Sequence, residues 1–377
     1  MEGSRDLEII RAIDGLHALE AEWQALHERS DPRNPFLSPA WTFACWAAQQ
    51  GSVGPFVVTL REGGRLVALA PLCIEKKSGF GVLRFIADDR SDYLGFLCDP
   101  ASRGVEQQLL DWILKTTGGW DLALFKQLSS DYSGLADSSI PASHASHLTT
   151  WTAAPFCASQ HDWDSLHDVG PSWLKITRKR LRRFLKDGWQ LERFTGAEAA
   201  AKLDLVASIE ARSWKGREGS TRLQRGAGQE LLRQAFESLS SGDQMQLWLA
   251  SIDGKAVAFQ IDFLMSDRLW VYQLAYDEAF RRTSAGSFLG YVSFENAWRG
   301  AVREYDYLGG EEPYKLDRTN GLRPIQYLAL HRRNPRGWLA FGLLVAPRWR
   351  LRNVSALRAV YKRAQALTRG IRARSNA

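Results

Sequence analysis

Apolar segments and polar turns follow one another most clearly between residues 268 and 317. Leu269 to Ala275 is apolar and aromatic with polar borders, which predicts a strand. A turn from Arg281 to Gly286 follows, and Ser284 is a suitable N-cap for the helix behind it. That helix is apolar on much of its circumference, and Tyr305 to Leu308 then predicts a second strand. The stretch therefore reads as strand, donor-rich turn, helix and strand.

The same pattern divides the chain into two similar series of elements. For the first series we expect helices over residues 7–28, 39–50 and 105–116, a hairpin over 56–74, and strands over 81–86, 93–98 and 122–125. For the second we expect helices over 172–187, 197–215 and 226–240, and strands over 189–194, 245–252, 255–264 and 325–331. Residues 128 to 170, rich in Ser, Ala, His and Asp, form the join. We infer an internal structural duplication with the boundaries 1–155, 156–333 and 334–377.

Charge is distributed unevenly along the 377 residues, whose net charge is +7. No Asp or Glu follows Asp317, and residues 318–377 hold fourteen Lys and Arg, which leaves 35 basic and 42 acidic residues before them. Apolar and basic clusters in residues 338–374 resemble an interfacial helix, so we expect peripheral contact with an anionic membrane. A tail that only improves solubility is the alternative.

Composition indicates a globular protein of a reducing compartment. The four cysteines are scattered, with no metal-ligand spacing and no disulfide framework. No stretch approaches the roughly 18 to 20 apolar residues that span a bilayer, and the N-terminus has no secretory signal pattern. We therefore expect a cytoplasmic protein, in peripheral contact with the inner face of the membrane if the tail binds lipid.

The turn at 281–286 has the chemistry of a phosphate site. Free backbone N–H groups and the helix dipole favour an anion, and Arg281 and Arg282 add charge-assisted hydrogen bonds. The chain has no Gly-x-Ser-x-Gly elbow, Walker loop or intact Gly-x-Gly-x-x-Gly, and no Cys-His pairing for nucleophilic catalysis. The pairs His144 with His147 and His161 with His167 lack accompanying ligands, so no metal site is predicted.

Several short motifs, taken in order, carry a family resemblance. They are Ser91-Asp92-Tyr93-Leu94-Gly95-Phe96-Leu97, Arg178-Lys179-Arg180-Leu181-Arg182-Arg183, Ser213-Trp214-Lys215-Gly216, Ser284-Ala285-Gly286 and Tyr305-Asp306-Tyr307-Leu308-Gly309-Gly310-Glu311-Glu312-Pro313-Tyr314-Lys315. Their order resembles the GNAT acyltransferase superfamily, and most closely its CelD/BcsL-like branch, a cellulose-biosynthesis type related to the tandem FemAB folds. The resemblance implies an α/β (α+β) tandem GNAT-like fold, two mixed β-sheets flanked by helices, with a basic helical C-terminal tail.

The resemblance also implies a cosubstrate, acetyl- or acyl-coenzyme A, and no permanently bound cofactor. Backbone groups of Gln273, Leu274, Ala275 and Tyr276 would then hold pantetheine and supply the oxyanion donor. The pyrophosphate would lie on Arg281, Arg282, Ser284, Ala285 and Gly286. In the superfamily pattern Gln/Arg-x-x-Gly-x-Gly/Ala, Ser284 stands where the first glycine is expected.

Acyl transfer needs a base for the acceptor and a proton donor for the leaving thiolate. Asp306, between two tyrosines, is the first candidate base and Glu210 the second. Tyr314 is the candidate proton donor, and Lys315 would orient Asp306 or bind an anionic group. Candidate acceptor contacts are Trp214 and Lys215 in the second half and Asp92 and Tyr93 in the first, which is expected to be a degenerate half without coenzyme A.

The resulting hypothesis is an N- or O-acyltransferase that acts on a sugar or amine in exopolysaccharide, cellulose or envelope biosynthesis. One alternative is a FemAB-like transferase that uses aminoacyl-tRNA, with the basic helix and tail on RNA. Another is a non-catalytic scaffold of a polysaccharide synthase. Nucleic acid is not expected as a partner under the first hypothesis.

Overall fold

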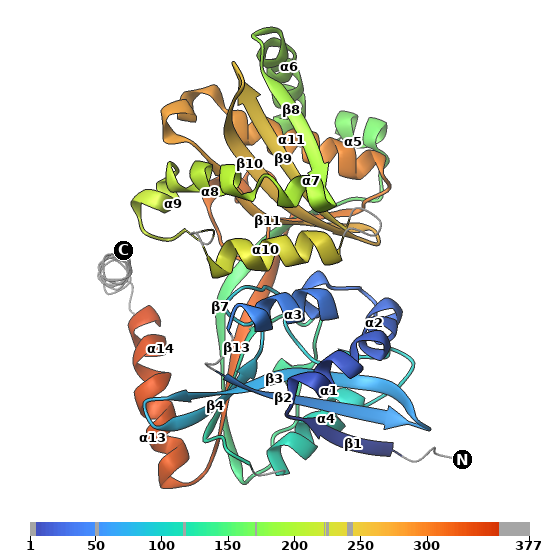
Figure 1. The fold of residues 1–377 in the computed structure, drawn as a ribbon, viewed down its shortest axis with the longest axis vertical. Coiled ribbons are helices and arrows are strands. Elements are labelled where there is room, and N and C mark those ends of the chain that lie inside the picture. The colour runs from blue at the N-terminus through green and yellow to red at the C-terminus, as the bar shows by residue number, and fades with distance from the viewer. Residues whose placement is uncertain are drawn as a thin grey trace. The chain divides into compact units, whose positions relative to one another are not determined.

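The computed structural model describes residues 5–49, 53–115, 118–169, 172–221, 223, 226–239 and 244–353 (Figure 1). Over these residues the chain forms two compact units. Unit 1 comprises residues 5–152 and 324–353, and unit 2 comprises residues 153–323.

Unit 1 is built on a hairpin of β2 (Val53–Glu62) and β3 (Arg65–Lys77), whose central residues are buried. Its other strands are β1 (Arg5–Ile10), β4 (Phe80–Phe85), β5 (Leu97–Cys98), β6 (Leu122–Leu128), the first part of β7 (His144–Ala158) and most of β13 (Gly321–Arg332). The hydrogen-bonded order is β1-β2-β3-β4-β6-β13-β7, with β5 beside β3. Its helices are α1 (Ile13–Ala18), α2 (Glu20–Arg29), η1 (Pro35–Leu37), α3 (Pro39–Ala47), α4 (Val105–Lys115), η2 (Leu135–Asp137), α13 (Pro335–Leu344) and α14 (Ala346–Asn353).

Unit 2 has a sheet in the order β7-β12-β11-β10-β9-β8, to which β7 contributes its last residues. Its other strands are β8 (Gln190–Thr195), β9 (Met245–Ile252), β10 (Lys255–Met265), β11 (Arg268–Tyr276) and β12 (Glu304–Asp306). Its helices are α5 (Trp163–Val169), α6 (Ser172–Lys186), α7 (Gly196–Ala200), α8 (Leu203–Ala211), α9 (Trp214–Arg217), α10 (Ala227–Ser238), η3 (Glu278–Thr283), α11 (Ala285–Arg299) and α12 (Pro313–Leu316).

The two units repeat one topology. In each, three antiparallel strands (β2-β3-β4 and β9-β10-β11) lead into a helix and then a strand parallel to the third, namely α4 with β6 and α11 with β12. Each set of three also has an outer strand: β1, before α1, pairs with β2, and β8, before α7, pairs with β9. This arrangement confirms the predicted α/β tandem fold with mixed sheets and flanking helices.

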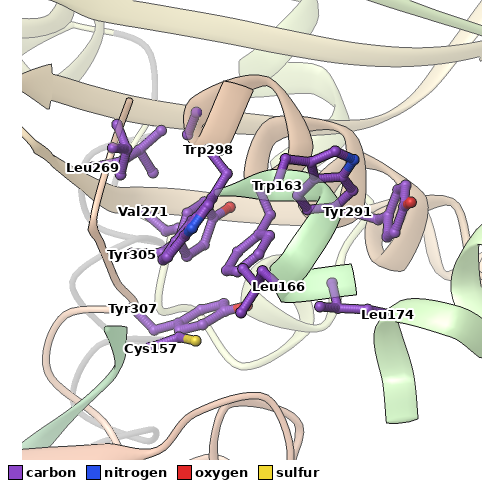
Figure 2. Close-up of a cluster of buried hydrophobic side chains, with 13 residues drawn as sticks. Cys157, Trp163, Leu166, Leu174, Leu269, Val271, Tyr291, Trp298, Tyr305 and Tyr307 are labelled. Carbon is purple, nitrogen blue, oxygen red and sulfur yellow. The ribbon is translucent and has the colours of Figure 1, made fainter. Parts of the chain in front are cut away.

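Alternation along β10 divides unit 2 into two packed layers. Ala258 packs with Phe288 and Leu289 of α11, whereas α8 contacts β10 and β11. Because successive side chains of a strand point to opposite faces, α11 covers one face together with α5 and α6, and α8 lies on the other. The first layer holds an aromatic cluster of Trp163, Tyr291, Phe294, Trp298, Tyr305 and Tyr307 (Figure 2).

Three predictions of secondary-structure elements were wrong. Residues 7–10 belong to β1, because pairing with β2 outweighs a helical spacing that continues only from Ile13. The strand predicted over 93–98 is reduced to Leu97–Cys98, and Tyr93 has a left-handed backbone with φ 55°. The predicted join contains β7, a strand of 15 residues with partly polar sides.

The unit boundary at Thr152 lies near the predicted residue 155, and α13 and α14 belong to unit 1 rather than to a separate tail. Residues 354–377, most of the predicted basic tail, lie outside the described residues. Within the described ranges, no helix has the length and apolar character needed to cross a bilayer.

Candidate active site

The turn before α11 begins with Asp277, which caps η3 by accepting a hydrogen bond from the Ala279 N–H (3.0 Å). Ser284 follows η3 with φ 64° and ψ 22°, a left-handed conformation that glycine adopts most easily. It is the residue at the expected first glycine of the superfamily pattern. Ser284 holds the predicted N-cap position of α11, but its side chain makes no capping hydrogen bond, because the left-handed backbone is not the extended one that a capping serine uses.

The first turn of α11 therefore has backbone N–H groups without a capping acceptor. Ser287 and Phe288 donate their N–H groups to the Ser284 carbonyl (2.9 and 3.1 Å), whereas the structure gives the buried N–H groups of Ala285 and Gly286 no partner among the described residues. Arg281 and Arg282 are exposed and likewise have no recorded partner there. Uncapped donors, a helix N-terminus and two cations at one turn are the features that an anion site requires.

The strand before this turn has an unpaired edge. β11 pairs with β12 only over Arg268–Trp270, against Glu304–Asp306. From Val271 to Tyr276 its recorded strand partner is β10 alone, with an irregularity at Tyr272. Backbone groups of β11 therefore diverge from β12 and become available to an extended ligand. Gly286 borders this edge, since a Cβ there would lie 3.3 Å from Tyr276 and 3.5 Å from Leu274.

Two charged side chains contact β11: Glu210 of α8 and Lys215 of α9. The buried Glu210 carboxylate accepts hydrogen bonds from the Gln273 side-chain amide and from the Leu223 N–H (2.8 Å). Lys215 Nζ donates to the Leu274 carbonyl at 2.9 Å. Gln273 Oε1 is buried without a hydrogen-bond partner, which is unusual for a folded protein. An unsatisfied acceptor on the strand with a free edge indicates where a ligand would donate.

Asp306 lies in a buried ion-pair network. Arg323 Nη1 binds its Oδ2 at 2.5 Å, and the Leu308 N–H binds its Oδ1 at 2.6 Å. The second arm of Arg323 reaches Glu304 Oε2 at 3.0 Å, and its guanidinium lies over the Phe156 ring. Because a buried arginine compensates this carboxylate, the geometry favours a structural role for Asp306.

Tyr314 and Lys315 are placed by α12. Lys315 Nζ binds Glu312 Oε2 (3.0 Å) and the Gly309 carbonyl (3.2 Å). The pKa of the Tyr314 phenol is raised, first by desolvation and then by the Glu312 charge, with smaller contributions from Tyr307 and Tyr276. These last two residues follow β12 and end β11 respectively, so Tyr314 stands where the two strands diverge. A phenol whose pKa is raised stays protonated, as a proton donor must.

Arg318 is a functional candidate that the sequence did not indicate. Its Nη2 donates to Ser287 Oγ in the first turn of α11 at 2.9 Å, and its guanidinium lies 5.2 Å from the centre of the Trp173 ring. It also lowers the pKa of Tyr307, although burial is the larger effect and raises that pKa overall. A sequence signal was absent, because Arg318 stands among many arginines and its partners are remote in the chain.

The remaining candidates are not all near this site. Trp214 is half-buried at the start of α9, next to Lys215. Asp92 and Tyr93 lie in unit 1, where Tyr93 is fully buried and stacks on Tyr132 with ring centres 4.7 Å apart. The Tyr93 ring is therefore core. A cavity of about 250 Å³ lies beside its partner, lined by Asn34, Glu106 and Tyr132 among others.

Comparisons with known proteins find one family match and several structural matches. Residues 174–316 match the family model described as an acetyltransferase (GNAT) domain. FemX matches with a TM-score of 0.59 at 10% identity, over 85% of this chain and 96% of that one. The C-terminal domain of a protein designated a lysylphosphatidylglycerol synthetase from Agrobacterium fabrum matches with a TM-score of 0.54 at 15% identity, over 88% and 96% of the two chains. A conserved protein of Bacteroides thetaiotaomicron has a TM-score of 0.53 at 14% identity, over 87% and 100%.

Among curated proteins, no sequence match was found. Residues 174–316, which begin in α6 and end with α12, are thus similar to a GNAT-type acyltransferase domain. The matched range contains the turn at Ser284, the free edge of β11 and both carboxylate candidates.

Proposed function

We propose that this protein transfers an acyl group, in the first instance acetyl, from a coenzyme A thioester to a sugar hydroxyl or an amine. The observation that carries the proposal is the turn before α11, where unpartnered N–H groups of Ala285 and Gly286 meet Arg281 and Arg282. A pyrophosphate fits this turn, and pantetheine would then extend along the free edge of β11 from Tyr276 towards Gln273. Backbone groups of Ala275 and Leu274 would contact pantetheine between these two residues.

Two side chains are proposed to move protons. Glu210 is the general base, because it is bound to Gln273 on the free-edged strand, whereas Asp306 is compensated by Arg323 and is assigned a positioning role. Tyr314 protonates the departing thiolate, and Lys315 fixes the loop that carries it. A backbone N–H of β11 would donate to the tetrahedral oxyanion.

The acceptor class and the pathway remain proposals from the CelD/BcsL-like resemblance: a sugar or amine in exopolysaccharide, cellulose or envelope assembly. Trp214 and Lys215 begin α9, which follows the helix of the proposed base, and are the proposed acceptor contacts in unit 2. Asp92 and Tyr93 are the proposed acceptor contacts within unit 1, where the buried Tyr93 ring would shape the wall at Tyr132.

A second candidate is transfer from aminoacyl-tRNA, as in the FemAB-like hypothesis. The observation that favours it is α6, which exposes Lys179, Arg180, Arg182, Arg183 and Lys186 along one side. Such a face would bind phosphates with a steep dependence on salt. The turn at Ser284 favours the coenzyme instead, because two arginines and a helix N-terminus match one pyrophosphate.

Calorimetric titration with acetyl-coenzyme A tests the proposal. We expect micromolar binding by the wild type and at least about tenfold weaker binding by the Arg281→Ala/Arg282→Ala variant, because two charge-assisted contacts are lost. The matched control is Arg299→Ala/Arg303→Ala, which removes two arginines at the other end of α11. Equal affinity for acetyl-coenzyme A in all three proteins would show that the donor does not bind at Arg281 and Arg282. Absence of binding by folded wild type would contradict the coenzyme A proposal and favour aminoacyl-tRNA as the donor.

A further inference from the structure

Helix α13 has one anchored face and one exposed face. Asn334 caps it by accepting a hydrogen bond from the Gly337 N–H at 2.7 Å, and Pro335 opens its first turn. Ala340 is buried and Phe341 packs in a cluster with residues of β4, β6 and β13. The helix is therefore a fixed part of unit 1, at one margin of that unit in Figure 1.

The exposed face of α13 is apolar. Trp338, Leu339 and Leu343 expose 49%, 54% and 59% of their surfaces, and Pro335 and Gly342 between them are exposed as well. These positions cover one side of a helix at its period of 3.6 residues. Arg336, exposed at the margin of this side, is paired with Asp121 at 2.6 Å. Three large apolar side chains side by side on one helix are more than scattered surface residues, and such a patch marks an interaction surface.

Arginines border this apolar face. Arg348 and Arg350 on α14 are exposed and have no recorded partner among the described residues, and Arg333 is exposed just before α13. The chain contains no Asp or Glu after Asp317, so no carboxylate of that part of the chain offsets them. Phe341 of α13 meets Trp349 of α14 with ring centres 6.2 Å apart, and both rings pack against the same core cluster, which joins α14 to α13.

We propose that α13 and α14 dock unit 1 on an anionic lipid bilayer, with Trp338, Leu339 and Leu343 inserted among the acyl chains and the arginines at the headgroups. Tryptophan and leucine on one face, with cations beside them, are the composition of helices that lie in the interface. A second copy of this chain fits less well, because it would bring arginine against arginine. RNA fits less well too, because leucine side chains offer bases no stacking surface.

This proposal is independent of the acyl transfer chemistry and is tested by co-sedimentation of the full chain with vesicles. We expect binding to vesicles of phosphatidylcholine mixed with phosphatidylglycerol, and at least about tenfold weaker binding to phosphatidylcholine alone. The Leu339→Ser/Leu343→Ser variant should lose at least about tenfold in affinity, because two inserted side chains become polar. Arg348→Glu/Arg350→Glu should lose at least about fivefold for each arginine.

Matched variants identify the surface. Leu148→Ser changes another exposed leucine of unit 1 (46% exposed, on β7), and Arg180→Glu/Arg183→Glu changes the rival basic helix α6. Both should bind within twofold of wild type. Loss of binding in the α6 variant with none in the α13 variant would overturn the proposal, as would absence of wild-type binding. Competition by excess soluble glycerol phosphate would also overturn it, because a headgroup pocket would then replace the bilayer surface.

Discussion

Ser284 shows how a single position connects sequence pattern to backbone geometry. Its φ of 64° is the conformation that the glycine of the superfamily pattern would adopt freely, and its hydroxyl caps nothing. A serine there bears a backbone cost of about 1 kcal/mol without a compensating side-chain bond.

We therefore expect Ser284→Gly to leave stability unchanged or raise it by up to about 1 kcal/mol, and Ser284→Val to lower it by about 1–2 kcal/mol, because a β-branched residue resists positive φ. Urea unfolding of the three proteins measures this. Acetyl-coenzyme A affinity should be kept in the glycine variant. A clear loss of stability in Ser284→Gly would contradict the left-handed turn.

Asp262 is a buried carboxyl without a cation. Gln260 Nε2 donates to its two oxygens (2.9 and 3.0 Å) and Ser293 Oγ to Oδ2 (2.6 Å), while Tyr305 completes the network through Gln260. Burial raises the pKa of Asp262 to about 7, against hydrogen bonds that lower it. The folded protein therefore keeps this proton at pH values where the unfolded chain has released it.

Since the folded pKa is the higher one, the contribution of Asp262 to stability falls as pH rises from about 4 to about 7, by roughly 3–4 kcal/mol. Asp262→Asn should be free of this loss, so its stability relative to wild type should increase over the same range. Urea unfolding at several pH values gives the comparison, with the exposed Asp267→Asn as a control that keeps the wild-type profile. Parallel profiles for wild type and Asp262→Asn would show that Asp262 does not titrate there.

The sequence could indicate parts of the site whose chemistry is local, and it missed parts that depend on pairing. Arg281, Arg282, Ser284 and Gly286 stand in one turn, so their order predicts an anion site before any fold is known. Arg323 is different: it follows Asp306 by 17 residues, and only the sheet brings the two together. Asp306 is therefore the first candidate base from sequence alone, whereas its arginine partner in the fold favours a structural role.

Among the elements, those with strong local signals were predictable. Ser38 caps α3 by accepting a hydrogen bond from the Trp41 N–H (3.2 Å), with Pro39 in the first turn, and the helix begins at residue 39 as predicted. β7 had no such signal, because Ser146, Leu148 and Thr150 on its exposed side mix polar and apolar residues. Its place is fixed by strands distant in sequence, such as β12, which pairs with Phe156–Ala158. Propensity cannot reveal a partner of that kind.

Helix α13 rests on a pair of histidines. His147 Nε2 and His331 Nε2 lie 3.2 Å apart, and Phe341 stacks on His147 with ring centres 3.9 Å apart. Burial lowers the pKa of His147, and the nearby His331 and Arg333 lower it further. The lowered pKa keeps the His147 ring neutral, and one of the two Nε2 atoms then donates a hydrogen bond to the other.

A lowered folded pKa means that this stabilisation is complete above the ordinary histidine pKa of about 6.5 and is lost as pH falls below it. We expect amide hydrogen exchange in α13, corrected for the intrinsic rate, to be several-fold faster near pH 5.5 than near pH 7.5. His147→Phe keeps the stacking and should remove the difference. Exchange that is equally fast at both pH values in the wild type would contradict a titrating contact.

For the molecule as a whole, the important feature is that unit 1 is discontinuous in the chain and unit 2 is continuous. β6, formed by residues 122–128, pairs on one edge with β4 and on the other with β13, whose residues come after the whole of unit 2. Unit 2 needs only residues 153–323, because its share of β7 pairs with β12 within that range. The end of β7 thus belongs to unit 2, and β13, which follows unit 2 in the chain, belongs to unit 1. Sequence order alone assigns residues 325–331 to the second half instead.

This arrangement predicts that the two units differ in autonomy. A chain of residues 153–323 should fold cooperatively and retain acetyl-coenzyme A affinity within about tenfold of the full protein, because all the proposed donor contacts lie inside it. A chain of residues 1–152 should fail to fold, because β6 lacks the strand that covers its edge and the α13 core is missing. Joining 1–152 to 324–353 through a flexible linker should restore folding of unit 1. Circular dichroism and thermal unfolding of the three chains give the answer, and a stably folded 1–152 would show that β13 is dispensable to the sheet of unit 1.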